Sequence, residues 1–387
     1  MVRHRRTVLF PESMQSHSKL LETMACQAFW DAREPVELHP DGLRICRAID
    51  APEHHLFFAT SGSSAEPKWI GLSKNALVAS AKAVNVHLRV TPDSVWGLAL
   101  PLHHVGGFGV LVRARAIGCD LKVFDSKWDA VMFCGWLDRQ HVSHASLVPT
   151  QVHDLVMAGC RAPDGLRAVV MGGGRLDVAA GRAARALGWP VLASYGLTEA
   201  GSQVATQSLC CLEDAYDPTP LPVLGHWRVR LDVVGCLEIA GPALFSGSIV
   251  GGEYHPRVGE WHATRDRVSV TPGGLVPEGR ADAVVKVAGE LVDPLAVESR
   301  LALAVGPHGD CLAVVAAADA RLGNRLVLVA ERRLPKEILD VAVADFNVGV
   351  PRSQRLDAPV WVDRLPRSAL GKIQRGRLRE WVEGGGG

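Results

Sequence analysis

The sequence predicts an α/β fold with a large N-terminal domain and a small α+β domain after it. Two observations support this. Short apolar runs alternate with amphipathic segments between residues 56 and 194, which is typical of a mostly parallel sheet covered by helices on both faces. The pattern then changes twice, to short glycine-rich β segments at 220–276 and to an α+β pattern after residue 279. We therefore predict an N-terminal domain over 1–280, with a β-rich subdomain at 220–276, and a C-terminal domain over 281–383.

Hydrophobic spacing predicts the individual elements in order. A helix is expected at 18–30, followed by irregular chain to residue 50, and Ser73 is expected to cap a later helix. The predicted strands of the large domain are 56–59, 95–100, 121–124, 145–148, 168–171 and 191–194. Its other predicted helices are a run ending at Ala116 and the segments 130–139, 150–158 and 178–187. The C-terminal domain is expected to contain strands at 311–316, 325–330 and 360–362 and helices at 293–305 and 335–346.

Composition narrows the function classes. A chain of 387 residues is long for one core, so two or more domains are expected. The net charge of +1 argues against a nucleic-acid partner, which usually meets a strongly basic face. No apolar run approaches the length of a membrane span, and the apolar stretch near the N-terminus is too short for a signal peptide. Nine cysteines without a C-x-x-C pair favour buried thiols in a reducing compartment, so we expect a cytoplasmic protein without a membrane partner.

A loop rich in hydroxyls follows the predicted strand at 56–59. It reads Thr60-Ser61-Gly62-Ser63-Ser64-Ala65-Glu66-Pro67-Lys68. Backbone N–H groups, hydroxyls and a lysine together suit the phosphates of a nucleotide. The spacing is not that of a Walker A loop. A flexible serine-rich surface turn is the alternative.

Four later stretches follow the loop: Tyr195–Glu199, Gly259–Asp266, Gly279–Asp282 with Lys286 beyond it, and Pro366–Ile373. In this order, the five motifs resemble the core motifs of the adenylate-forming superfamily of acyl-CoA and aryl-CoA synthetases, luciferases and adenylation domains. The resemblance runs from about Phe57 to Arg379. It implies an ATP-dependent acid–thiol ligase that forms an acyl-adenylate, with ATP, Mg²⁺, a small carboxylic acid and coenzyme A as ligands. Such chemistry needs charge neutralisation and in-line positioning at phosphorus.

The resemblance also implies a role for each nucleotide-side residue. Glu199 is expected to bind Mg²⁺, a hard ion that prefers oxygen ligands. Thr198 would contact the α-phosphate, and Asp266 would accept hydrogen bonds from the ribose hydroxyls. Arg280 would contact ribose or phosphate. The remaining ATP/AMP-binding candidates are Thr60, Ser61, Gly62, Ser63, Ser64 and Lys68 for the phosphates, and Gly172, Gly173, Gly174, Ser194, Tyr195 and Gly196 around the base.

The C-terminal motifs carry the remaining implied roles. Lys372 matches the catalytic lysine, which would bridge the carboxylate and the α-phosphate. Asp282 matches the hinge of a mobile C-terminal lid domain. Gly289 and Glu290 lie where the family presents a surface to coenzyme A. Rotation about the hinge would exchange Lys372 for this surface.

The expected acid-binding residues are His104, Gly106 and Arg113. Pro101–Gly107 and Leu111–Arg113 are similar to the o-succinylbenzoate–CoA ligases of menaquinone biosynthesis, whose acid has a second carboxylate. A buried Arg113 would suit that carboxylate. Alternatively, Arg113 is a surface helix residue and His104 a packed loop histidine.

Two departures from the family pattern keep other functions open. Alanine replaces the usual glycine at Ala65, and the region before Phe57 is shorter than usual, so a homodimer covering that surface is a hypothesis. The alternatives are another aryl- or acyl-CoA ligase, an enzyme that loads a carrier-protein thiol, and a degenerate nucleotide-binding paralogue without activity. Retention of Lys68, Glu199, Asp266, Arg280 and Lys372 argues against the last.

Overall fold

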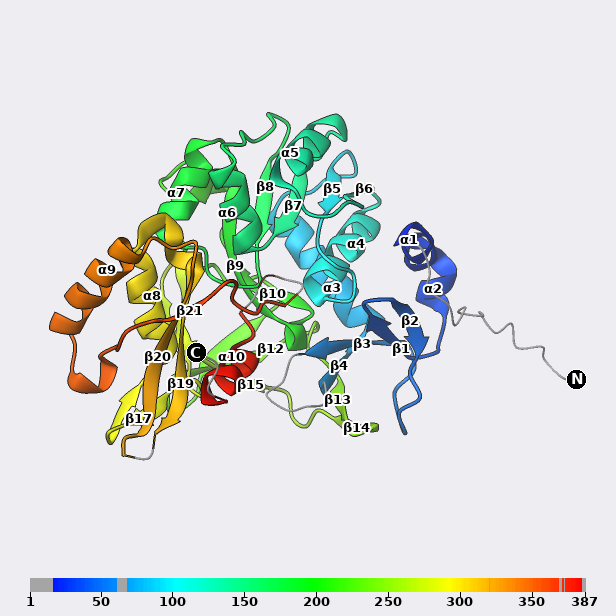
Figure 1. Cartoon of the computed structure of the whole chain (residues 1–387). Helices are drawn as coiled ribbons and strands as arrows, with labels where there is room; N and C mark the ends of the chain where they lie inside the picture. Colours follow the sequence, from blue (N-terminus) through cyan, green and yellow to red (C-terminus); the bar gives the residue numbers. More distant parts are fainter. Residues whose placement is uncertain (1–16, 61–67, 320, 369–370, 372, 385–387) are drawn as a thin grey trace, which may run out of the picture.

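The computed structural model describes residues 17–60, 68–319, 321–368, 371 and 373–384. Figure 1 shows a large assembly of sheets and helices, followed by the smaller C-terminal group of α8, α9, α10 and β17 to β21. None of the helices in the described part of the chain has the length and apolar composition that crossing a bilayer requires.

The predicted parallel sheet is present, with strand order β10-β9-β8-β7-β5-β6. Its strands are parallel except for β10, which runs antiparallel to β9. They are β5 (Val95–Leu98), β6 (Asp120–Val123), β7 (His144–Leu147), β8 (Ala168–Met171), β9 (Val191–Leu197) and β10 (Ser202–Thr206). The apolar runs of β7 and β8 are buried along their whole length, as expected for strands covered on both faces.

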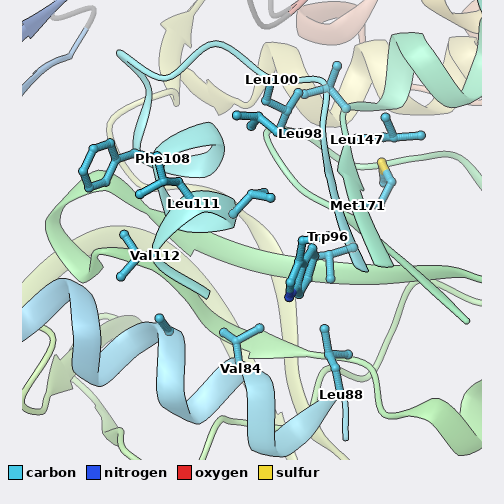
Figure 2. Packing of buried hydrophobic residues seen from close by; sticks show 14 of the residues in the cluster. Val84, Leu88, Trp96, Leu98, Leu100, Phe108, Leu111, Val112, Leu147 and Met171 are labelled. Atoms are coloured by element: carbon cyan, nitrogen blue, oxygen red, sulfur yellow. The ribbon is translucent and has the colours of Figure 1, made fainter. Parts of the chain in front are cut away.

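Helices cover this sheet. They are α3 (Lys74–His87), α4 (Val105–Ile117), α5 (Ala130–Arg139), α6 (Pro149–Met157) and α7 (Val178–Ala186). The Ser73 hydroxyl caps α3 by accepting from the Ala76 N–H at 3.0 Å, as predicted. Figure 2 shows side chains of α3, α4, β5, β7 and β8 meeting in the main core, with Trp96 of β5 at its centre.

A second six-stranded sheet has the order β14-β13-β4-β3-β1-β2. Its strands are β1 (Val36–His39), β2 (Gly42–Ile45), β3 (His55–Thr60), β4 (Lys68–Ser73), β13 (Gly247–Val250) and β14 (Glu253–Pro256). The expectation of irregular chain up to residue 50 is therefore wrong. Val36 and Leu38 alternate with half-buried residues, and a four-residue strand of this kind is too short for a clear periodic signal. The single helix expected at 18–30 is instead two, α1 (His17–Ala25) and α2 (Gln27–Asp31).

The β-rich stretch forms a four-stranded antiparallel sheet of order β11-β12-β15-β16. Its strands are β11 (Arg228–Leu231), β12 (Cys236–Ala240), β15 (His262–Thr271) and β16 (Gly274–Arg280). Short 3₁₀ helices precede it, η1 (Thr198–Ala200) and η2 (Leu209–Leu212). Within 220–276, only β13 and β14 leave this sheet, because they pair with each other and with β4.

The C-terminal part has its own apolar clusters, whose buried members begin at Val287, whereas those of the main core end at Leu275. It contains β17 (Val285–Val287), β18 (Glu290–Val292), α8 (Pro294–Ala304), η3 (Gly306–Cys311), β19 (Leu312–Asp319), β20 (Gly323–Glu331), α9 (Lys336–Val348), η4 (Arg352–Gln354), β21 (Val360–Val362) and α10 (Arg375–Glu383). The α/β class is thus confirmed. The domain boundary at residue 280 stays a prediction.

Candidate functional site

The predicted phosphate loop connects two paired strands. Thr60 ends β3, Lys68 begins β4, and the two residues are partners across the antiparallel pair. The Thr60 hydroxyl donates to the Lys68 carbonyl at 3.1 Å. Ser61, Gly62, Ser63 and Ser64, together with Ala65, lie outside the described residues. The pairing of Thr60 with Lys68 across β3 and β4 fixes both ends of the loop.

The Tyr195–Glu199 motif forms the β9–β10 hairpin. Gly196 must be glycine, because a Cβ built there would lie 1.8 Å from the Ser202 carbonyl oxygen. The backbone carbonyl of Glu199 accepts from the Phe245 N–H at 2.8 Å, which fixes η1 against the segment before β13. The Ser194 hydroxyl accepts from Thr206 at 3.0 Å. Thr198 and Glu199 are half-buried at this end of the sheet.

Asp266 on β15 is held from two directions. The Tyr195 hydroxyl donates to its Oδ2 at 2.5 Å, and Arg280 Nη1 lies 3.5 Å from its Oδ1. Arg280 also donates to both carboxylate oxygens of Asp282, each at 2.8 Å. Burial and the Asp266 carboxylate raise the pKa of Tyr195, so the phenol stays protonated and remains a donor. The predicted ribose ligand, base-side tyrosine and hinge residue thus share one hydrogen-bond network.

His262 lies among the charged candidates of the site. Burial lowers its pKa, the Glu199 charge opposes that shift, and Lys68 adds to it. Its ring centroid is 4.9 Å from that of Phe245, the residue that binds the Glu199 backbone. Lys68, Glu199 and Asp266 thus all act electrostatically on one histidine that the sequence did not single out. The signal available was its position, four residues before Asp266.

The metal role predicted for Glu199 is compatible with its surroundings. The described residues contain no group of three or more His, Cys, Asp or Glu side chains that could hold a metal by themselves. Mg²⁺ is commonly bound by one or two carboxylates, with substrate phosphates and water as the other ligands. A carboxylate on η1, which packs against β4, fits this pattern.

Gly172, Gly173 and Gly174 follow β8 at the carboxyl end of the parallel sheet. The Gly172 N–H donates to the Leu147 carbonyl at 3.0 Å, and a Cβ added at Gly172 would meet no atom within 4 Å. Gly173 has a φ of +79°, which favours glycine. In sheets of this type ligands bind at the carboxyl ends of the strands. The open space beside Gly172 lies at that end.

Arg113 on α4 is one of the most deeply buried polar residues, only 2% exposed. Its Nη1 donates to the Ser146 hydroxyl at 3.1 Å and its Nη2 to the Ser202 hydroxyl at 3.2 Å, while its guanidinium lies 5.3 Å from the Trp96 ring. No carboxylate of the described residues lies within 4 Å of it. Burial lowers its pKa to about 10, so it remains charged at neutral pH. The alternative of a surface helix residue is wrong.

His104 and Gly106 lie at the start of the same helix. His104 is the half-buried residue just before α4, with its ring 4.2 Å from that of His103. A Cβ at Gly106 would come no closer than 3.9 Å to Leu100. Both interpretations of His104, as part of the acid pocket or as a packed loop residue, therefore stay open.

The C-terminal candidates are placed unequally. Lys372 lies outside the described residues, but Gly371 beside it, with a φ of +72°, packs against the first turn of α6: a Cβ there would lie 2.4 Å from the Thr150 hydroxyl. Gly289 and Glu290 occupy the β17–β18 turn, where Glu290 accepts from the Ser353 hydroxyl. The contacts of the described residues do not join this turn to Asp266 or Glu199. The coenzyme A role stays a prediction.

The chain is similar to known proteins in sequence and in fold. A model of the AMP-binding enzyme family matches residues 14–247. The 2-succinylbenzoate–CoA ligase of Escherichia coli is 32% identical, over 84% of this chain and 68% of its own length. A probable 2-succinylbenzoate–CoA ligase of Mycobacterium tuberculosis is 31% identical, over 87% of this chain and 86% of its own length. A solved structure of Escherichia coli MenE with bound OSB-AMS superposes with a TM-score of 0.71 at 28% identity, covering 85% of this chain and 69% of the other.

Proposed function

The chain belongs to the AMP-binding enzyme family, and from this premise we propose that it is an ATP-dependent ligase that joins 2-succinylbenzoate to coenzyme A. In the first step a carboxylate oxygen attacks the α-phosphorus of ATP, giving an acyl-adenylate and releasing pyrophosphate. In the second step the thiol of coenzyme A attacks the acyl carbon, giving the thioester and releasing AMP. The enzyme is thus an acid–thiol ligase.

The observation that carries the choice of acid is the buried Arg113 cation, whose two hydrogen-bond partners named above are neutral hydroxyls. A buried charge without a counter-charge is costly, and a carboxylate that arrives with the substrate supplies the missing partner. The Trp96 indole N–H is a second buried donor, without a hydrogen-bond partner among the described residues. These two buried donors suit the second carboxylate of 2-succinylbenzoate, whereas a monoacid substrate has no second carboxylate to accept from them.

The remaining residues divide the ATP chemistry between them. Lys68 and Thr60 would hold the phosphates at the ends of their loop, and Asp266 would bind the ribose, with Tyr195 against the base. Glu199 would hold Mg²⁺, which supplies charge neutralisation at the phosphates when bound. Arg280 forms ion pairs with two carboxylates, Asp266 and Asp282. It could keep one of these pairs while the other breaks, which suits a residue next to a hinge. Lys372 would approach from the segment that packs on Thr150.

The test is to incubate the purified protein with ATP, Mg²⁺ and 2-succinylbenzoate, with and without coenzyme A, while measuring pyrophosphate release and thioester mass. Thioester with this acid, and none with benzoate, coumarate or fatty acids, is the expected result. Thioester with another acid only would make the protein a different acyl-CoA ligase. Pyrophosphate without thioester would indicate a carrier-protein thiol, and ATP binding without turnover a degenerate paralogue.

Three finer assignments are proposals as well. A cytoplasmic location is supported by the nine cysteines, all of them free thiols, and gel filtration tests the homodimer. Limited proteolysis tests the predicted boundary near Arg280, because a hinge between two domains should be cut before either domain is.

A further inference from the structure

Two free thiols outside the site lie where α5 packs against α6. Cys134 is in the middle of α5, and Cys160 follows α6. The Cys134 thiol donates to the carbonyl oxygen of Arg161, the neighbour of Cys160, at 2.9 Å, and each of the two thiols affects the pKa of the other. The contact joins two elements that are separate in the sequence but pack together (Figure 1).

Each thiol is held by its own element. The Cys160 N–H donates to the Leu155 carbonyl at 3.0 Å, and the Cys160 carbonyl accepts from the Trp189 indole at 2.8 Å. Cys134 is positioned by α5, whose Phe133 and Leu137 side chains are buried in the main core. Because the Cys134 thiol is held beside the residue that follows Cys160, side-chain rotations can bring the two sulfurs to the S–S distance of about 2.05 Å.

We propose that Cys134 and Cys160 form a reversible disulfide with a small-molecule disulfide such as oxidised glutathione as the oxidant. One thiolate attacks a glutathione sulfur and releases one glutathione thiolate. The second cysteine then attacks the mixed disulfide at the protein sulfur and releases the second glutathione. The protein loses two protons and two electrons, and one glutathione disulfide becomes two glutathione thiols.

Both thiols are only half-buried, so the oxidant has access to them. Burial raises the pKa of each, and the nearby carboxylates of Asp138 and Asp129 add to the shift. Oxidation should therefore be slow at neutral pH and accelerate as pH rises, because the thiolate is the attacking species. The disulfide would close the segment that contains β7 and α6 and tie α5 to the end of α6.

The experiment treats the full-length protein with oxidised glutathione at pH 7 and pH 9 and maps the cysteines by mass spectrometry, before and after reduction with dithiothreitol. We expect a peptide cross-linked through Cys134 and Cys160 that has lost two hydrogen atoms, forms faster at pH 9, and disappears on reduction. The melting temperature should rise by about 5 °C on oxidation, because the cross-link restricts the unfolded chain.

The variants Cys134→Ser and Cys160→Ser should each abolish the rise, whereas the exposed Cys26→Ser is the matched control and should retain it. Stable glutathione adducts on both cysteines, a cross-link to other cysteines, or no reaction at pH 9 would each overturn the proposal. If a serine variant fails to fold, the peptide map of the unsubstituted protein decides the question alone.

Discussion

The two ends of the site handle charge in opposite ways. At the nucleotide end, Arg280 and Arg265 together balance the charges of Asp266 and Asp282, and the Arg280 and Asp282 side chains are respectively half and about a third exposed. At the acid end, Arg113 is enclosed by Trp96 and two serine hydroxyls, with its charge uncompensated by the described residues. The first network is complete without a ligand. The second becomes complete only with an anion.

This difference gives the two ends different roles: the nucleotide end contributes affinity for ATP, and the acid end contributes specificity for the acid. A charge network that can exchange partners lets Arg280 and Asp266 release one contact when they gain another, at small net cost because solvent screens them. A buried cation cannot do this, so it discriminates strongly between an acid that brings a carboxylate and one that does not. Substitutions at the acid end should therefore change the kinetics with the acid, and substitutions at the nucleotide end should change the KM for ATP.

The largest effect is expected for Arg113→Met. The kcat/KM for 2-succinylbenzoate should fall on the order of 10³-fold, because the second carboxylate would be buried without a partner. Thermal stability should stay the same or rise, because a buried charge is replaced by an apolar chain. Steady-state kinetics and a thermal melt measure both. Arg115→Met, two residues along α4 and bonded to Gln27 at the surface, is the matched control. An equal loss of kcat/KM in both variants would show that Arg113 does not bind the acid.

The second prediction concerns the pH dependence of stability at the acid end. His144 on β7 is fully buried with its ring 5.3 Å from Trp96, and burial lowers its pKa to about 4. In the unfolded chain the His144 side chain is protonated below about pH 6.5, whereas in the folded protein it stays neutral down to about pH 4. The contribution of His144 to the free energy of unfolding is therefore fully present above about pH 6.5. It declines as the pH falls toward 4, by up to about 3 kcal/mol.

Urea unfolding of the unsubstituted protein and His144→Gln at pH 7.5 and pH 4.5 measures this decline. The variant should lose less stability between the two pH values. His226, whose pKa burial also lowers to about 4, should supply part of the remaining slope. His255→Gln, on the exposed strand β14, should keep the full decline. An unchanged slope in His144→Gln would contradict the assignment.

A smaller effect is expected for Asp266→Asn at the nucleotide end. The KM for ATP should rise about 10- to 100-fold, because the amide loses the charge that strengthens bonds to the ribose hydroxyls. The KM for the acid should change little. Kinetics with either substrate varied make this distinction, and Asp93→Asn on the surface serves as control. A rise confined to the acid KM would place Asp266 elsewhere in the mechanism.

The smallest effect is expected for Tyr195→Phe. The ring is kept and only the hydrogen bond to Asp266 is lost, so the KM for ATP should rise about 2- to 10-fold. Tyr195→Ala should cost more, because it also removes the ring proposed to stack on adenine. Equal effects of the two substitutions, measured by ATP titration, would mean that only the hydroxyl contributes.

Periodicity predicted most elements of the fold because each strong pattern is local. The helix at 130–139 and the strand at 168–171 match α5 and β8 in full. The strands at 36–45 were missed because their burial depends on pairing beyond the local pattern, namely of β1 with β3 about 20 residues further along. A four-residue strand carries too little pattern to reveal this by itself.

The site divides in the same way. The motifs identified Tyr195, Glu199 and Asp266, but not the network joining Tyr195 to Asp266 across 71 residues. Arg113 was recognised as a candidate, yet its burial depends on Ser146 and Ser202, which no spacing rule connects to it. Sequence patterns predict which residues carry chemistry. The neutral residues that enclose them emerge only from the packing.

The pairing of β4 with β13 affects how the chain folds during synthesis. Gly71 lies opposite Gly247, so the second sheet cannot be completed until about 175 further residues have been made. At ribosomal rates of about 5–20 residues per second this takes roughly 10–35 s. Throughout that interval the edge of β4, the strand that begins at Lys68, is an unpaired template for other chains. Translation arrest before residue 247 should therefore produce an aggregation-prone nascent chain, and slow translation across this interval should make the yield of native protein depend on chaperones.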